Sequence, residues 1–135
     1  MNESRVFTLN LAMPYDQAMK TIEEAFKVEG FGFLTHVDVR ATFKAKLNAD
    51  FRPFSIIGVC NPALSHRLLT AEPRIGLLLP CKVTVEGAGD GQSTVRIINP
   101  QTIVDSGLGD DPEIEKVADE AEARILRVVG ELEKL

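Results

Sequence analysis

The sequence predicts an α+β fold in which the first and last helices cover one face of a mostly antiparallel sheet. Three observations predict it. Apolar and polar residues alternate, as in half-buried strands, at residues 6–11 and on both sides of a glycine-rich turn at 87–91. Two segments, beginning at Pro14 and Pro112, have the apolar spacing of amphipathic helices. A length of 135 residues, 44% of them hydrophobic, fits a single domain spanning residues 1–135.

The first two elements are a strand and a helix. The strand covers residues 6–11 and presents Phe7, Leu9 and Leu11 on one face. The helix begins at Pro14 and ends at Gly30, a residue that commonly terminates helices. Its apolar stripe predicts a role in the core and consists of Tyr15, Met19, Ile22 and Phe26.

The next elements are a strand, a short helix and an aromatic loop. We expect the strand, residues 31–39, to return beside the first strand, with Thr35 and Val37 on one face and His36 exposed on the other. Residues 41–47 follow as the short helix. In the loop at 50–54, two phenylalanines flank Arg52 and Pro53, and we expect them to plug the core.

The second half contains a buried strand, a helix, a hairpin and a long helix. The strand covers residues 55–59, and the helix runs from Pro62 to near Pro73. Residues 75–79 are expected as a buried turn or a strand. The hairpin pairs residues 83–86 with 94–97. After a looser stretch, the last helix is capped by Asp111 and starts at Pro112.

The last helix has an apolar seam with spacings of four and three residues, made of Ile114, Ala118, Ala121, Ile125, Val128, Leu132 and Leu135. Its predicted length, about 35 Å, is more than one face of a small sheet needs. We therefore expect a second copy of the chain to cover the end of the seam, Val128, Leu132 and Leu135, in a symmetric homodimer.

Cys60 and Cys81 are the strongest candidates for chemistry, because both lie beside a proline at the edges of one helical segment. Asn61 is a helix cap after Cys60, and Pro62 suits the first helical position. A thiol at the positive end of a helix is favoured as a thiolate. The same two cysteines are equally typical of small buried apolar residues, and a disulfide between them would require an oxidising compartment.

The sequence gives weaker indications of other functional residues and partners. His66 lies four residues after Pro62 and could accept a proton from the Cys60 thiol, while Arg52 is a further ligand-binding candidate. The cysteines lack the paired spacing of zinc sites, so no metal is expected. The charge is −5, and residues 83–135 hold 12 acidic and 5 basic residues without a basic cluster, so no nucleic acid is expected. The sequence lacks an apolar run of membrane length and a signal-peptide pattern, which predicts a cytoplasmic protein.

Several segments of the chain resemble the uncharacterised bacterial and archaeal family known as domain of unknown function 302. They are residues 30–35, 41–44, 50–54, 57–62, 66–67, 72–76 and 78–81. The resemblance implies a β-α-β unit followed by further strands and a closing helix, in the group of folds similar to the TATA-binding-protein repeat. It implies no established activity, and the cofactor is left unknown. His36 stands where many members of the family carry an acidic residue.

These observations favour a ligand-binding or thiol-redox module centred on Cys60 and Cys81, with a small molecule as its partner. The alternative is a structural or interaction protein, a homodimer whose cysteines are buried and inert. An enzyme ranks third, since the chain has no serine elbow, carboxylate pair or nucleotide-binding fingerprint.

Overall fold

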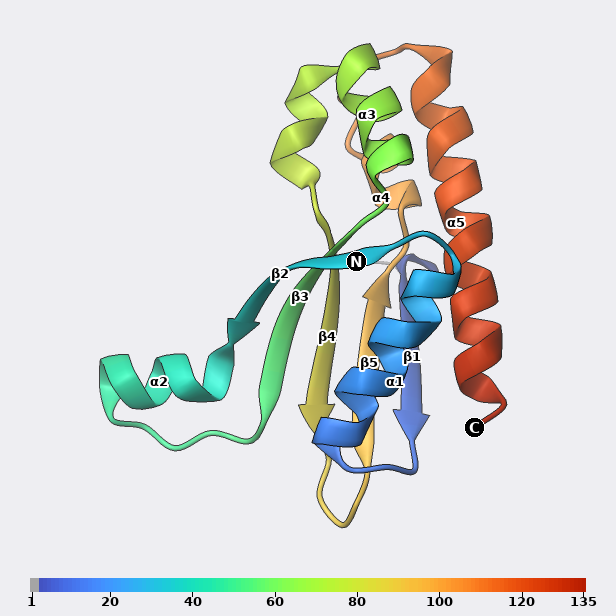
Figure 1. The fold of residues 1–135 in the computed structure, drawn as a ribbon. Coiled ribbons are helices and arrows are strands. Elements are labelled where there is room, and N and C mark those ends of the chain that lie inside the picture. The colour runs from blue at the N-terminus through green and yellow to red at the C-terminus, as the bar shows by residue number, and fades with distance from the viewer. Residues whose placement is uncertain (1–2) are drawn as a thin grey trace.

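The structure is a computed structural model and describes residues 3–135. Its centre is a five-stranded antiparallel sheet with the order β1-β5-β4-β3-β2 (Figure 1). The strands are β1 (Val6–Leu11), β2 (Gly32–Asp38), β3 (Phe54–Cys60), β4 (Cys81–Gly87) and β5 (Ser93–Ile98). The helices are α1 (Tyr15–Val28), α2 (Val39–Leu47), α3 (Pro62–Ala71), α4 (Gln101–Asp105) and α5 (Pro112–Glu133), with 3-10 turns η1 (Glu3–Arg5) and η2 (Pro73–Leu78). The predicted α+β class with a closing C-terminal helix is confirmed.

The main core lies between the sheet and two helices, α1 and α5. Ile22 and Phe26 of α1 are fully buried, as are Ile125 of α5 and Val83 and Val95 of the central strands. These helices therefore cover the same face of the sheet, as the sequence predicts.

A second, smaller core lies beyond the end of the sheet. It joins Leu64 and Leu68 of α3, Ile75 of η2 and Val117 of α5. The 22-residue α5 thus packs its C-terminal half on the sheet and its N-terminal half on α3 (Figure 1).

The two cores together correct the expectation for the end of the α5 seam, since Val128 and Leu132 belong to the main core. Val128 and Leu132 are each 1% exposed, so the chain itself already covers them, and only Leu135 is exposed. The expectation that a second copy covers Val128 and Leu132 is wrong. The reason is that α3 and η2 lengthen the body of the protein, so the whole of α5 finds partners within its own chain.

The predicted placement of the second strand beside the first is also wrong. β1 pairs with β5, and β2 pairs with β3 at the opposite edge of the sheet. An apolar alternation identifies a strand but does not specify its neighbour, because either edge satisfies the same pattern. Thr35 and Val37 share one face, and His36 is exposed on the other, as predicted. The His36 Nε2 also lies 2.6 Å from the Ser55 hydroxyl.

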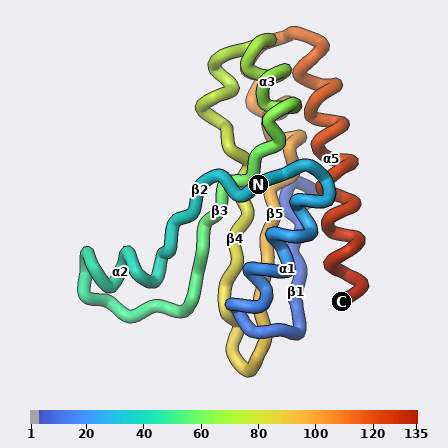
Figure 2. Tube along the Cα trace, in the orientation of Figure 1, coloured from blue at the N-terminus to red at the C-terminus, as the bar shows by residue number. Residues whose placement is uncertain are grey.

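The segment from the end of β2 to the start of β3 stands away from the body (Figure 2). The rings of Phe51 and Phe54 pack near one another, and Phe51 also contacts Phe43 of α2. Neither ring belongs to the two cores, so the expected plug over the core is wrong.

Residues 75–79 are neither a strand nor a buried turn. Most of the segment belongs to the 3-10 turn η2, and the Leu77 side chain is 85% exposed.

Candidate functional site

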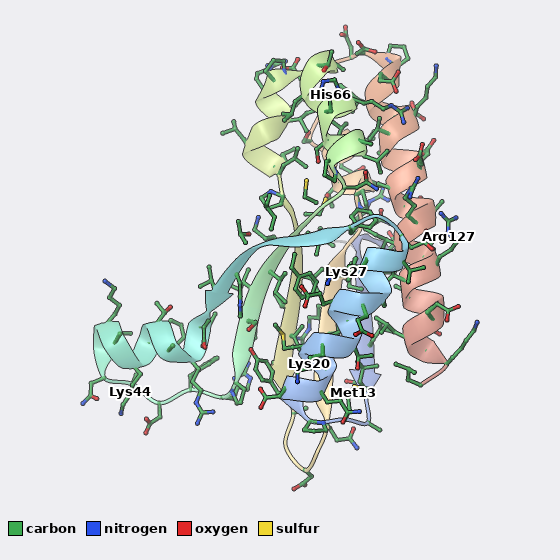
Figure 3. The ribbon with its side chains drawn as sticks, viewed as in Figure 1. Met13, Lys20, Lys27, Lys44, His66 and Arg127 are labelled. Atoms are coloured by element: carbon green, nitrogen blue, oxygen red, sulfur yellow. The ribbon has the colours of Figure 1, made fainter. Side chains whose placement is uncertain are left out.

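The five candidate residues predicted from the sequence do not form one site. Cys60, Asn61 and Cys81 lie together where β3 ends and β4 begins. Arg52 precedes the other end of β3, eight residues before Cys60, which is about 26 Å along a strand at about 3.3 Å per residue. His66 lies on α3, beyond the end of the sheet (Figure 3).

The two cysteines occupy the same edge of the fold, as predicted, because Val59 pairs with Cys81 across β3 and β4. Cys81 shares the helix-covered face with Val59 and packs against the core. Cys60 is the next residue after Val59, and since consecutive strand residues point to opposite faces, its side chain leaves the sheet on the other side. Both thiols are free, and the Cys60 Sγ lies 3.2 Å from the Ser65 Oγ.

Burial makes Cys81 a poor nucleophile. Loss of hydration raises the pKa of its thiol to about 11, with the Lys82 ammonium opposing the rise and Cys60 adding to it. The hollow beside Cys81 measures only about 30 Å³ and is lined mainly by apolar side chains. That volume holds about one water molecule and no organic ligand.

Asn61 is confirmed as the cap of α3. Its Oδ1 accepts a hydrogen bond from the Leu64 N–H at 3.3 Å, and its Nδ2 donates to the Glu29 carbonyl at 3.5 Å. The residue is 8% exposed. The Asn61 side chain therefore joins the start of α3 to the end of α1.

His66 is exposed and lies in a shallow hollow with Arg67, Asp111 and Glu113, between α3 and the start of α5. Arg67 is bound there by Glu113 and Glu120. The hydrogen-bond partner of the Cys60 sulfur is Ser65. The structure therefore does not bring His66 to the cysteine as the proton acceptor that the sequence suggested.

Arg52 belongs to an ion-pair network that the sequence analysis missed. Its Nε donates to the Glu86 Oε2 at 2.5 Å, and the Arg96 Nη1 donates to the other oxygen, Oε1. The Arg96 hydrogen bond is the main cause that lowers the pKa of Glu86; burial opposes it and Arg52 reinforces it. The sequence did hold a signal for this pair, because Glu86 and Arg96 both alternate with inward-facing residues of the predicted hairpin and so lie on its outer face.

A second missed cluster joins α1, β2 and β3. The buried Ser55 hydroxyl lies 2.6 Å from the His36 Nε2 and also forms a hydrogen bond with the Tyr15 hydroxyl. No spacing rule connects residues 15, 36 and 55. Ser55 is 0% exposed, so its hydroxyl holds the two rings in place and is not open to a substrate.

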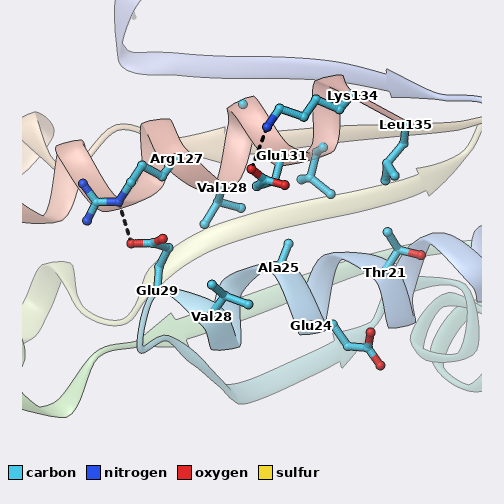
Figure 4. Close-up of a pocket in the computed structure, with 12 residues that line it drawn as sticks. Thr21, Glu24, Ala25, Val28, Glu29, Arg127, Val128, Glu131, Lys134 and Leu135 are labelled. Atoms are coloured by element: carbon cyan, nitrogen blue, oxygen red, sulfur yellow. Dashed lines mark hydrogen bonds and ion pairs between the residues drawn. The ribbon is translucent and has the colours of Figure 1, made fainter.

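A ligand-sized groove lies between α1 and the C-terminal half of α5 (Figure 4). Its volume is about 530 Å³. Apolar atoms form most of the lining, and two ion pairs flank it, Arg127 with Glu29 and Lys134 with Glu131, both at 2.8–2.9 Å. The apolar lining residues are Ala25, Val28, Val128, Leu132 and Leu135.

The raised pKa of Cys81 predicts slow alkylation. Only the thiolate reacts, and a rise from 9.0 to about 11 lowers its fraction roughly hundredfold near pH 8. In a Cys60→Ser variant, iodoacetamide should therefore label Cys81 in the native protein far more slowly than in urea, and the native rate should keep rising up to about pH 11. Equal rates in the native and unfolded protein would contradict the burial.

No helix within residues 3–135 has the length and apolar character to cross a membrane. In the same part of the chain, no three histidine, cysteine or acidic side chains gather as a metal site would require.

Comparison with known proteins gives one family. The family described as "Domain of unknown function DUF302" matches residues 7–132. The crystal structure of an uncharacterized conserved DUF302 protein from Bacillus stearothermophilus is similar, with 27% identity and a TM-score of 0.81, over 95% of this chain and 98% of that one. None of the curated proteins matches. The chain therefore belongs to the DUF302 family.

Proposed function

We propose that the protein is a ligand-binding module whose site is the α1–α5 groove. The observation that carries this proposal is the contrast in volume, about 530 Å³ in the groove against about 30 Å³ beside Cys81. Small-molecule sites generally measure 300–1,000 Å³ and are mostly apolar. A ligand would also cover Val28 and Leu135, which are 80% and 68% exposed.

The charge of the lining favours a ligand with a cationic group. Three carboxylates and two cations border the groove. Glu29 and Glu131 are paired, whereas Glu24 forms no ion pair with any residue in the described range 3–135. An amphipathic amine with an extended apolar chain therefore complements the groove, since its chain would cover the apolar floor and its ammonium would face Glu24.

Two observations weigh against thiol-redox chemistry at the cysteines. The side chains of Cys60 and Cys81 leave the sheet on opposite faces, and burial disfavours the thiolate of Cys81. Cys60 is the one cysteine that lies next to a helix start, beside Ser65 of α3, as the thiol hypothesis requires.

A Val28→Asp substitution should weaken binding of an apolar ligand in the groove without unfolding the protein. Val28 is 80% exposed, so no core packing is lost, and a carboxylate in the last turn of α1 should lower the free energy of unfolding by no more than about 1 kcal/mol. Nile red, a neutral apolar dye, should bind wild type and be displaced by dodecylamine better than by dodecanoate. Val28→Asp should weaken dye binding about tenfold or more, because a carboxylate would be buried against the apolar dye.

The matched control is Leu126→Asp, which changes an exposed leucine of α5 outside the groove lining. It should bind the dye as wild type does. Equal binding by wild type and Val28→Asp would mean that the groove is not the site.

A homodimer is the second candidate, and the projecting segment 38–54 favours it. Leu47 of α2 is 70% exposed there, and Leu34 of β2, just before the segment, is 64% exposed. The segment carries four basic and two acidic residues, whereas the rest of the chain carries 11 and 18. Because the segment is basic and the rest of the chain is acidic, the charges favour a second copy of the chain as the partner of this segment. Sedimentation velocity at micromolar concentration should show the dimer, and the dimer should weaken in high salt.

A further inference from the structure

Within residues 3–135, no helix lies across one face of the sheet. Because α1 and α5 share the opposite face, the pairing register identifies the residues on the uncovered side. They are Val6, Thr8, Asn10, Gly32, Thr35, Val37, Phe54, Ile56, Gly58, Cys60, Lys82, Thr84, Glu86, Thr94, Arg96 and Ile98. Glu86 is the single carboxylate in this set. With Arg52 reaching over from the loop before β3, the face carries three cations and one anion, a net charge of +2 on a chain of −5.

Glu86 holds two guanidinium groups side by side on that face. Its side chain is 10% exposed, while those of Arg52 and Arg96 are 51% and 46% exposed. Arg52 is also held by the aromatic loop, because its guanidinium carbon lies 4.5 Å from the centre of the Phe51 ring and 5.6 Å from that of Phe54. The carboxylate therefore lies beneath the two arginines, whose outer edges face solvent.

Each arginine retains unused donors. Arg52 binds Glu86 through Nε, which leaves both of its terminal nitrogens, and Arg96 binds through Nη1, which leaves Nε and Nη2. Those four nitrogens have no other hydrogen-bond partner within residues 3–135. Guanidinium groups with free, adjacent donors match the oxygens of a phosphate group, which they bind in a bidentate manner.

We propose that Arg52 and Arg96, oriented by Glu86, form a binding site for a phosphate group, either free or carried by a small organic molecule. A phosphate monoester has a charge of about −1.5 to −2 near neutral pH. At the site itself, the two guanidinium groups and the Glu86 carboxylate leave a net charge of +1, since Lys82 lies four residues away along β4. Phosphate is favoured because it presents more oxygens to the four free donors than the two of a single carboxylate. The site lies on the face opposite the α1–α5 groove, so it is independent of the ligand proposed for the groove.

Isothermal titration with inorganic phosphate, in low salt at pH 7.5, tests this proposal. Wild type should bind phosphate saturably and should bind acetate at least about tenfold more weakly. Arg96→Gln should weaken phosphate binding about tenfold or more, because charge-assisted hydrogen bonds are lost. Arg52→Lys retains the charge but loses the planar fork, and it should weaken binding as well.

The matched control is Arg74→Gln, which changes an exposed arginine that is likewise paired with a glutamate, Glu72. It should bind phosphate as wild type does. Circular dichroism shows whether each variant is folded. If Arg96→Gln fails to fold, amide chemical shifts of the wild-type protein decide the matter, since phosphate should shift residues of β4, β5 and the loop at 50–53. No saturable binding by wild type, equal binding of acetate, or shifts confined to another surface would overturn the proposal.

Discussion

Phe26→Ala is expected to lower the free energy of unfolding by about 3–5 kcal/mol, the usual cost of deleting a large buried aromatic side chain. Phe26 is 0% exposed and is among the largest fully buried side chains of the core between α1 and the sheet. Its ring lies edge-on to Phe31, with 5.8 Å between centroids, and 6.3 Å from Phe33. Alanine would leave a cavity beside Phe31 and Phe33, and the pairing of β2 with β3 limits how far these neighbours can close it.

Urea unfolding followed by circular dichroism measures this loss. Phe43→Ala is the matched control, because Phe43 is half-buried on the projecting α2 and lies outside both cores. Its loss of stability should be clearly smaller. Equal losses in the two variants would show that α1 does not close the core as described.

Gly58→Ala is expected to lower the free energy of unfolding by about 1–3 kcal/mol, through overpacking. A Cβ at this position would lie less than 3.0 Å from the Pro80 Cγ and from the Thr35 Oγ1. Both atoms belong to neighbouring segments that pack directly over the glycine. The strand can accommodate the methyl group only if the proline ring or the threonine side chain moves.

Gly32→Ala provides the control for Gly58→Ala, because Gly32 lies on the adjacent strand and a Cβ there has no neighbour within 4 Å. That variant should keep or slightly gain stability, since alanine restricts the unfolded chain more than glycine does. The two variants are compared by their urea midpoints, provided that the free energy of unfolding falls with urea concentration at the same slope in both. A Gly58→Ala variant as stable as Gly32→Ala would contradict the close packing over β3.

Most of the helices and strands could be predicted from the sequence, because their signals are local. The Asn61 cap and Pro62 mark the start of α3, and the Asp111 cap and Pro112 mark the start of α5. The glycine-rich turn identified the β4–β5 hairpin. The position of β2 could not be predicted, since strand pairing between distant segments depends on contacts that alternation does not encode.

The candidate site was only partly predictable for the same reason. The sequence places Cys60 at a helix start, which is a local property, and the structure agrees. The burial that raises the pKa of Cys81 comes from packing against the core, which no residue near Cys81 in the sequence signals. The groove likewise forms only when α1 and α5 lie side by side on the sheet.

The measurement that most directly tests the central claim is a map of amide chemical shifts during titration with dodecylamine. The account predicts saturable shifts along both walls of the groove, at residues 21–29 of the α1 end and 127–135 of the α5 end. It predicts no such shifts at residues 60–65 and 79–82, around the two cysteines. Shifts centred on Cys60 and Cys81, with the groove unchanged, would contradict the claim that the groove is the binding site.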